Sequence, residues 1–156
     1  MAYASPAANV VNCGALINVQ AFRATQGYLP LPLAYGAEEV DLALQLLDGG
    51  RHIVRDDRLR VFHATDRSHH ASAAVSAASV RNLLLLGFVR YPKRLWPVAG
   101  MQALNRIMWL LRNGRTRGIF QGLLSTPSAL WKHRDSRAPV RAEAVRAYRA
   151  LSRQLI

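Results

Sequence analysis

The sequence contains a single cysteine, Cys13, and has no acidic residue before Glu38. One thiol cannot form an internal disulfide or a cysteine-rich zinc site, and such low cysteine use fits a reducing compartment. Free cysteines are usually buried, so Cys13 is expected to be a small buried hydrophobe rather than a nucleophile.

Acidic residues are also scarce in the second half of the chain. Residues 1–80 contain six Lys/Arg and seven Asp/Glu, and residues 81–156 contain fifteen and two; the resulting charges of −1 and +13 add up to +12. A one-sided basic segment indicates a polyanionic partner, either nucleic acid or the anionic face of a membrane. Nearly all of this charge is Arg, which suits phosphate groups of both kinds.

The basic half lacks a long hydrophobic run. Its longest uncharged run, residues 118–131, has fourteen residues and contains Pro127, whereas a spanning helix needs roughly 18 to 20. Residues 1–22 lack the basic start of a signal peptide, and Pro6 interrupts their apolar character, so no export signal is expected. With 156 residues and 51% apolar content, the chain is about one domain long and is expected to be globular.

The hydrophobic pattern predicts an α/β fold that becomes helical in its second half. Residues 8–22 predict a strand, a turn and the start of a helix, and residues 27–36 predict a loop because they contain two prolines in alternate positions. Residues 51–57 and 58–64 predict two short strands. Residues 68–79 are small and polar enough for a mobile loop or a weak helix, and helices are expected from Arg81 onward with a break at Pro92.

A helix is predicted from about Ala37 to Asp48. Its apolar residues repeat at helical spacing, Gly49-Gly50 supplies a stop, and Glu38, Glu39 and Asp41 lie in or near its first turn. Taken alone, these carboxylates are explained by the helix dipole, which favours negative charge at this end. This part of the chain is nevertheless unusual, since residues 35–70 hold seven of the nine acidic residues and four of the five histidines.

The order of these features resembles the C-terminal half of the catalytic domain of inverting family 2 glycosyltransferases, which have the GT-A fold. The resemblance spans about residues 10–86 and is carried by "YGAEEVDLALQLLDGG", then "VFHA", then "RN"; the matching residues are Tyr35, Gly36, Glu38, Glu39, Asp41, Leu42, Leu44, Gly50, His63, Arg81 and Asn82. It implies a partial GT-A-like catalytic half, residues 1–80, with few short strands and an acidic-start helix. An all-helical, Arg/Leu-rich tail, residues 81–156, follows.

The resemblance also assigns site residues. Glu39 matches the general base, which takes the proton from the acceptor hydroxyl, while Glu38 and Asp41 are expected to bind acceptor or to be structural. His63 matches a histidine that helps bind the divalent metal, Mg or Mn, if the full catalytic domain is present; a hydrogen-bonded histidine at a strand end is the alternative. His69 and His70 are expected near the pyrophosphate or exposed to solvent.

The sequence departs from the family in three respects. No Asp-x-Asp motif precedes Glu38, so the nucleotide-binding half has no counterpart; "GYLPLP" replaces the usual Gly-Gly-Phe-Asp-Glu; and Gln45 replaces an Arg. The chain is therefore expected to be a truncated or split glycosyltransferase that is inactive alone. The intact enzyme would transfer a sugar from a nucleotide-sugar donor to a hydroxyl or lipid-linked acceptor, in cell-surface polysaccharide or glycolipid synthesis.

The basic tail allows two interpretations, which are compatible with each other. Its Trp and Arg residues beside Leu-rich segments are typical of helices that lie in an anionic membrane surface, and equally of core helices with an Arg-rich outer face. Nucleic acid is not an expected partner because the aromatics lie within apolar runs and no nucleic-acid motif is present. We expect a cytoplasmic protein, peripheral at the inner face of the cell membrane. The alternative function is a non-catalytic membrane-surface or partner-binding remnant that pairs with a separate donor-binding half.

Overall fold

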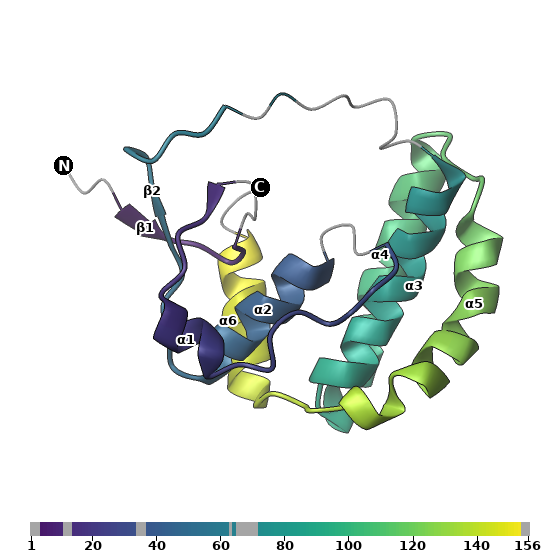
Figure 1. Cartoon of the computed structure of the whole chain (residues 1–156). Coiled ribbons are helices and arrows are strands. Elements are labelled where there is room, and N and C mark those ends of the chain that lie inside the picture. The colour runs from purple at the N-terminus through teal and green to yellow at the C-terminus, as the bar shows by residue number, and fades with distance from the viewer. Residues whose placement is uncertain (1–3, 11–13, 34–36, 63, 65–71, 154–156) are drawn as a thin grey trace. The chain divides into compact units, whose positions relative to one another are not determined.

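A computed structural model of the chain describes all residues except 1–3, 11–13, 34–36, 63, 65–71 and 154–156 (Figure 1). The elements follow in the order β1 (Ala4–Pro6), α1 (Val19–Arg23), α2 (Ala37–Asp48), β2 (Val54–Asp56), α3 (Ala73–Arg90), η3 (Lys93–Leu95), α4 (Trp96–Arg112), α5 (Ile119–Lys132), η4 (Arg134–Ser136) and α6 (Ala142–Arg153). The fold is therefore mixed, as predicted, but dominated by helices. Its two strands form an antiparallel sheet in which Ala4 pairs with Asp56 and Pro6 with Val54.

The strand predicted at residues 58–64 is wrong for its described part, residues 58–62 and 64, which form a turn and irregular chain. Asp56 ends β2 by accepting hydrogen bonds at Oδ1 from the backbone N–H and the Nε of Arg58, at 3.0 and 2.9 Å. These hydrogen bonds lower the pKa of Asp56 to about 2. The side chain thus turns the backbone away from the sheet.

Of the two alternatives predicted for residues 68–79, a mobile loop or a weak helix, the helix is confirmed from Ala73 onward, where the 18-residue helix α3 begins. Ser72 caps this helix, with its side chain accepting from the backbone N–H of Val75. Among the residues with a described placement, α3 is one helix whose length and composition would allow it to cross a membrane, but 67% of it is buried in the fold. Such burial is also typical of a core helix in a soluble protein.

The chain divides into two compact units, which are described separately. Unit 1 comprises residues 1–29, 38–64 and 140–156, and unit 2 comprises residues 30–37 and 65–139. The functional division at residue 80 remains a prediction.

In unit 1, a small apolar cluster forms around α2. Val10, Leu42 and Leu46 are buried, and partly buried apolar side chains from α1 and its approach, among them Phe22, pack against them. The bounds of α2 confirm the predicted helix. Its stop at Gly50, which has φ +70°, lets the next N–H, that of Arg51, donate to the carbonyl of Leu46 at 2.9 Å.

In unit 2, α3 is the central helix, and α4 and α5 both pack against it. Two glycines allow the close approach. A Cβ on Gly87 would lie 2.3 Å from the Cβ of Ala99, and a Cβ on Gly122 would lie 2.6 Å from the carbonyl oxygen of Ala77. Small residues at these crossings therefore decide how closely the helices pack.

Candidate functional site

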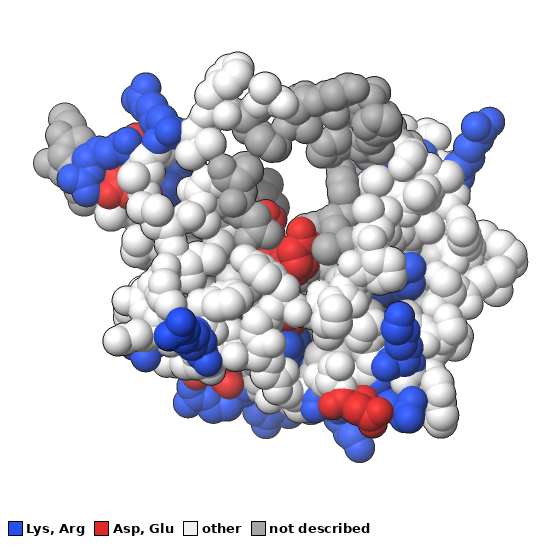
Figure 2. Space-filling model, viewed as in Figure 1, with Lys and Arg blue, Asp and Glu red and all other residues white. Residues whose placement is uncertain are grey.

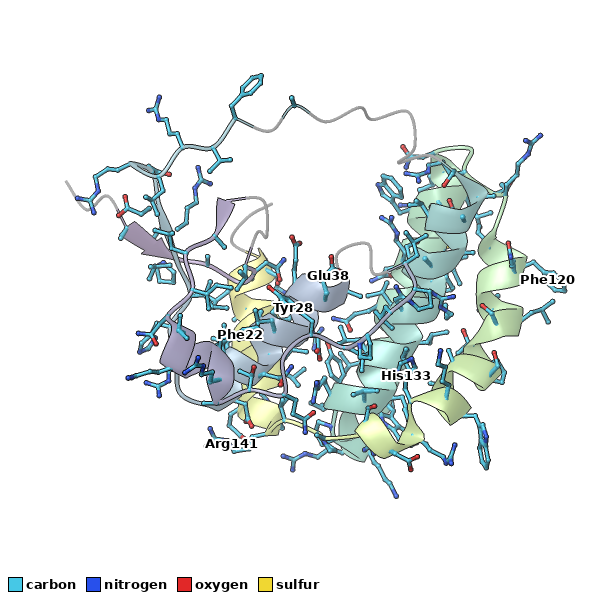
Figure 3. The ribbon with its side chains drawn as sticks, viewed as in Figure 1. Phe22, Tyr28, Glu38, Phe120, His133 and Arg141 are labelled. Atoms are coloured by element: carbon cyan, nitrogen blue, oxygen red, sulfur yellow. The ribbon has the colours of Figure 1, made fainter. Side chains whose placement is uncertain are left out.

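The acidic start of α2 lies beside Tyr28, which comes from the loop after α1. Partial burial raises the pKa of Tyr28, and the charges of Glu39 and then Glu38 raise it further. Both carboxylates are half-buried, and Figure 3 shows Glu38 and Tyr28 in the same region of unit 1. The first turn of α2 thus faces a phenol as well as solvent.

The charge of Glu39 also affects the pKa of a second phenol, Tyr148 of α6. Burial raises the pKa of Tyr148, hydrogen bonds with Ser152 and Asn9 lower it, and the charge of Glu39 raises it again. Glu39 therefore influences phenols from two segments that are far apart in the sequence. Of the two carboxylates, Glu39 has the larger effect on the pKa of Tyr28.

Asp41 has a different environment. Its side chain is buried, with 1% of the residue exposed, and Oδ2 accepts from Nε2 of Gln45 at 3.1 Å. The same Gln45 amide donates to the carbonyl of Gly27 at 3.0 Å and accepts from the N–H of Gln26 at 2.8 Å. Asp41 and Gln45 thus fasten the loop after α1 to α2, and these contacts favour the structural alternative for Asp41 over acceptor binding.

One carboxylate oxygen of Glu38 accepts no hydrogen bond from the described residues. This atom, Oε2, is buried. A buried carboxylate oxygen without a donor is costly, so such atoms in folded proteins usually have a hydrogen-bond partner in the protein, in water or in a ligand. The site therefore has two carboxylates at one helix start, and Oε2 of Glu38 has no donor among the described residues.

The described residues do not test the predicted metal site. His63, His69, His70 and Cys13 lie outside them. Within the described part of the chain, no group of three or more His, Cys, Asp or Glu side chains could hold a metal ion. The predicted Mg or Mn site with His63 thus stays a prediction.

Sequence reasoning placed Glu38, Glu39 and Asp41 on one helix start but missed the phenols and the role of Gln45. Tyr28 could have been suspected because it shortly precedes the acidic helix. Tyr148 lies about a hundred residues beyond Glu39, and no local pattern connects such distant positions. The coupling of Glu39 to both phenols therefore emerges only from the folded chain.

Unit 2 presents a second feature, an apolar outer surface on two helices. On α4 the exposed residues Met101, Leu104, Met108 and Leu111 recur at helical spacing, and on α5 the same holds for Phe120, Leu123, Leu124 and Trp131. Phe120 and Trp131 are 73% and 72% exposed. These two stripes are called the outer apolar faces below, and each lies on a helix that packs against α3.

Cations accompany the outer apolar faces. The guanidinium of Arg134 lies 4.3 Å from the ring centre of Trp131, and those of Arg106 and Arg115 lie 4.6 and 5.6 Å from that of Trp109. Between Asp66 and Asp135 the sequence has eleven Lys/Arg and no acidic residue. In Figure 2 the surface over the helices of unit 2 is mainly uncharged, with separate basic side chains.

Comparisons with protein-family models, curated proteins and solved structures find no match for this chain. The resemblance to family 2 glycosyltransferases therefore rests on the order of residues in the sequence.

Proposed function

We propose that this chain forms the acceptor side of a GT-A-like, inverting family 2 glycosyltransferase. The observation that supports the proposal is the start of α2. Glu39 is half-buried there, and its charge raises the pKa of two phenols, Tyr28 and Tyr148, while the side chain of Asp41 is buried. A rigid helix start holds a carboxylate at a fixed position, as a general base requires. The proposed setting is the cytoplasmic face of the membrane, in cell-surface polysaccharide or glycolipid synthesis.

In the proposed reaction, Glu39 accepts the proton of an acceptor hydroxyl as that oxygen attacks the anomeric carbon. The new C–O bond forms as the bond from the anomeric carbon to the phosphate oxygen breaks, so the nucleoside diphosphate leaves with the bonding electrons and the configuration inverts. Oε2 of Glu38, which has no hydrogen-bond partner among the described residues, is proposed to accept from a second acceptor hydroxyl. A divalent metal, Mg or Mn, would be held mainly by the donor-binding half of the complete catalytic domain, with His63 as the proposed ligand from this chain, and would stabilise the negative charge of the leaving diphosphate.

The test uses the protein recovered from its native cells with any separately encoded donor-binding half that accompanies it. Transfer of a radiolabelled sugar from nucleotide-sugar donors to a membrane lipid extract is measured for the wild type and Glu39→Gln. Loss of a general base is expected to slow transfer by about 10²- to 10⁴-fold, with donor binding unchanged. Glu143→Gln is the control, because Glu143 is an exposed carboxylate of the same charge on another helix. Unchanged turnover of Glu39→Gln removes Glu39 from the role.

A second candidate is a non-catalytic part that attaches a donor-binding partner to an anionic membrane surface. The outer apolar faces of α4 and α5, together with the absence of acidic residues between Asp66 and Asp135, favour it. Under this alternative Glu39→Gln leaves transfer by the assembled enzyme unchanged, whereas loss of the outer apolar faces releases the protein from the membrane.

A further inference from the structure

A pocket of about 210 Å³ lies in unit 2, between α3 and the C-terminal end of α5. Three of its lining residues carry basic nitrogens: Arg81 from α3, Lys132 at the end of α5, and His133 directly after it. The remaining wall combines the hydroxyls of Ser125 and Ser128 with small and apolar side chains. Among the described residues the lining contains no carboxylate, and the acid nearest to His133 in the sequence, Asp135, is exposed and pairs with Arg134 at 3.5 Å.

Arg81 lines this pocket, and part of its guanidinium has no hydrogen-bond partner among the described residues. Nε donates to Oδ1 of Asn82 at 3.1 Å, but Nη2 is buried and lacks a hydrogen-bond partner in the part of the chain that the structure describes. A buried N–H of a charged group that stays unpaired is costly. Such an atom in a folded protein usually indicates a water or an ion that completes the site.

Asn82 makes hydrogen bonds to two parts of the pocket wall, the guanidinium of Arg81 and the segment that contains Leu31 and Pro32. Its Oδ1 accepts from Arg81, while its Nδ2 donates to the carbonyl of Leu33 at 2.8 Å. That second bond holds the segment with Leu31 and Pro32, which line the pocket, beside α3. The pocket is thus built by fixed contacts within unit 2 rather than by surface side chains alone.

His133 is the third basic group, and only 5% of it is exposed. Its backbone N–H donates to the carbonyl of Ala129 at 3.1 Å, and its carbonyl accepts from the N–H of Ser136 at 3.1 Å. Burial lowers the pKa of His133, and the positive charges of Lys132 and Arg81 lower it further. Apart from Arg81, Lys132 and His133, the described lining residues carry no charge. A bound anion would therefore offset the repulsion and favour the protonated ring.

We propose that this pocket binds a phosphate group, as inorganic phosphate or as a phosphomonoester. An Arg, a Lys and a histidine that can become protonated together provide charge-assisted hydrogen bonds to phosphate oxygens. The volume is small for a large ligand but suits a phosphate with a short apolar substituent, which would contact Leu31 and Leu85. This proposal does not depend on Glu39, so Glu39→Gln is expected to leave phosphate binding unchanged.

The test is calorimetric titration of the full chain with inorganic phosphate and methyl phosphate at constant ionic strength. Arg81→Met is expected to raise the Kd at least about tenfold, because hydrogen bonds to charged groups are lost. Arg112→Met, which removes an equal charge from an exposed position on α4, is the control and is expected to change the Kd by less than about twofold. Absence of saturable binding, or an equal loss in Arg112→Met, overturns the proposal.

Lys132→Met is a second variant for the case in which Arg81→Met does not fold. Because Lys132 is exposed, its replacement is expected to leave the fold intact. It is expected to weaken phosphate binding several-fold, with Lys93→Met as its control. A second readout is the pKa of His133 measured by NMR, which should rise when phosphate is added but not when chloride replaces it. An unchanged pKa at saturating phosphate contradicts binding beside the ring.

Vesicles distinguish the two sources of a phosphate group. If Arg81→Met and Lys132→Met reduce binding to vesicles with phosphatidic acid more than to vesicles with phosphatidylglycerol, the phosphomonoester comes from a lipid headgroup. If vesicle binding is unchanged while titration with soluble phosphate is impaired, the ligand is a soluble phosphate. Both outcomes support the pocket, and both differ from loss of sugar transfer in Glu39→Gln.

Discussion

Arg141 and Asp48 lie 93 residues apart in the sequence and join the start of α6 to the end of α2. The backbone N–H and the Nε of Arg141 both donate to Oδ1 of Asp48 at 2.9 Å, and the guanidinium also donates to the backbone carbonyl of Asp48. The Arg141 guanidinium thus satisfies a carbonyl at the end of α2, while Asp48 accepts from the residue that directly precedes α6. This contact helps explain why the C-terminal helix belongs to unit 1.

Asp48→Ala is expected to lower the free energy of unfolding by about 1 kcal/mol, because a charge-assisted contact is lost but the pair is partly exposed. Urea unfolding followed by circular dichroism measures the change. Glu143→Ala is the matched control, since Glu143 pairs with Arg146 at 3.5 Å within one exposed helix. Equal effects of the two substitutions would show that the connection between α2 and α6 adds nothing beyond an ordinary surface pair.

Gly87→Ala and Gly122→Ala are each expected to destabilise unit 2 by about 1–3 kcal/mol, because a new methyl group would overlap Ala99 or the Ala77 carbonyl. Thermal unfolding provides the measurement. The control is Gly100→Ala in α4, where a new Cβ has nothing within 4 Å. There the higher helix propensity of Ala should stabilise by up to about 1 kcal/mol. Stabilisation by all three substitutions would contradict close packing at the two crossings.

A helix or strand can be predicted from the sequence when residues near to it in the chain determine it, and not when contacts with distant residues do. The bounds of α2 were predictable because Val40, Leu44 and Leu47 repeat at helical spacing and Gly49 and Gly50 follow. The first turns of α3 were not, because their Ala- and Ser-rich sequence carries little amphipathic signal and becomes helical by burial against neighbouring helices. A cap at Ser72 followed by Val75 was the local indication that could have revealed it.

At the strand that was wrongly predicted after β2, the local pattern indicated a strand but long-range pairing did not form it. Alternating Arg and apolar residues at 58–62 imitate a half-buried strand, but a strand also requires a neighbour with which to pair. Only the pairing of β1 with β2 is formed among the described residues, and the turn at Asp56 directs the chain away from it. For the site, the helix start with Glu39 was predictable, whereas its proximity to Tyr148 depends on long-range packing.

The environment of Glu39 can be tested through the two phenols. Glu39→Gln is expected to lower the pKa of both Tyr28 and Tyr148, because the negative charge that disfavours their ionisation is removed. Glu38→Gln should lower the pKa of Tyr28 and leave that of Tyr148 nearly unchanged. NMR titration of the tyrosine ring carbons resolves the two residues. A shift of Tyr148 in Glu38→Gln but not in Glu39→Gln would reverse the assignment of the carboxylates.

His133 is expected to make the stability of unit 2 depend on pH. Its pKa in the folded protein lies below the ordinary value of about 6.5, so the unfolded chain binds a proton that the folded chain does not. The stabilisation is therefore complete above about pH 6.5 and is lost as the pH falls toward the pKa of the folded state. Urea unfolding between pH 7.5 and pH 5 should show a smaller loss in His133→Gln than in the wild type. Parallel curves would exclude this contribution.

The outer apolar faces predict a particular salt dependence of membrane binding. In flotation with vesicles that contain phosphatidylglycerol, binding should weaken with salt, as the attraction of Lys and Arg is screened, but persist at high salt through apolar insertion. Phe120→Ser should lower the partition coefficient by about fivefold to tenfold, since an inserted aromatic side chain contributes through its buried apolar area. Phe62→Ser is the control, because Phe62 is 93% exposed but lies in unit 1. Binding that disappears completely at high salt, or that responds equally to both substitutions, would mean that α4 and α5 do not enter the lipid.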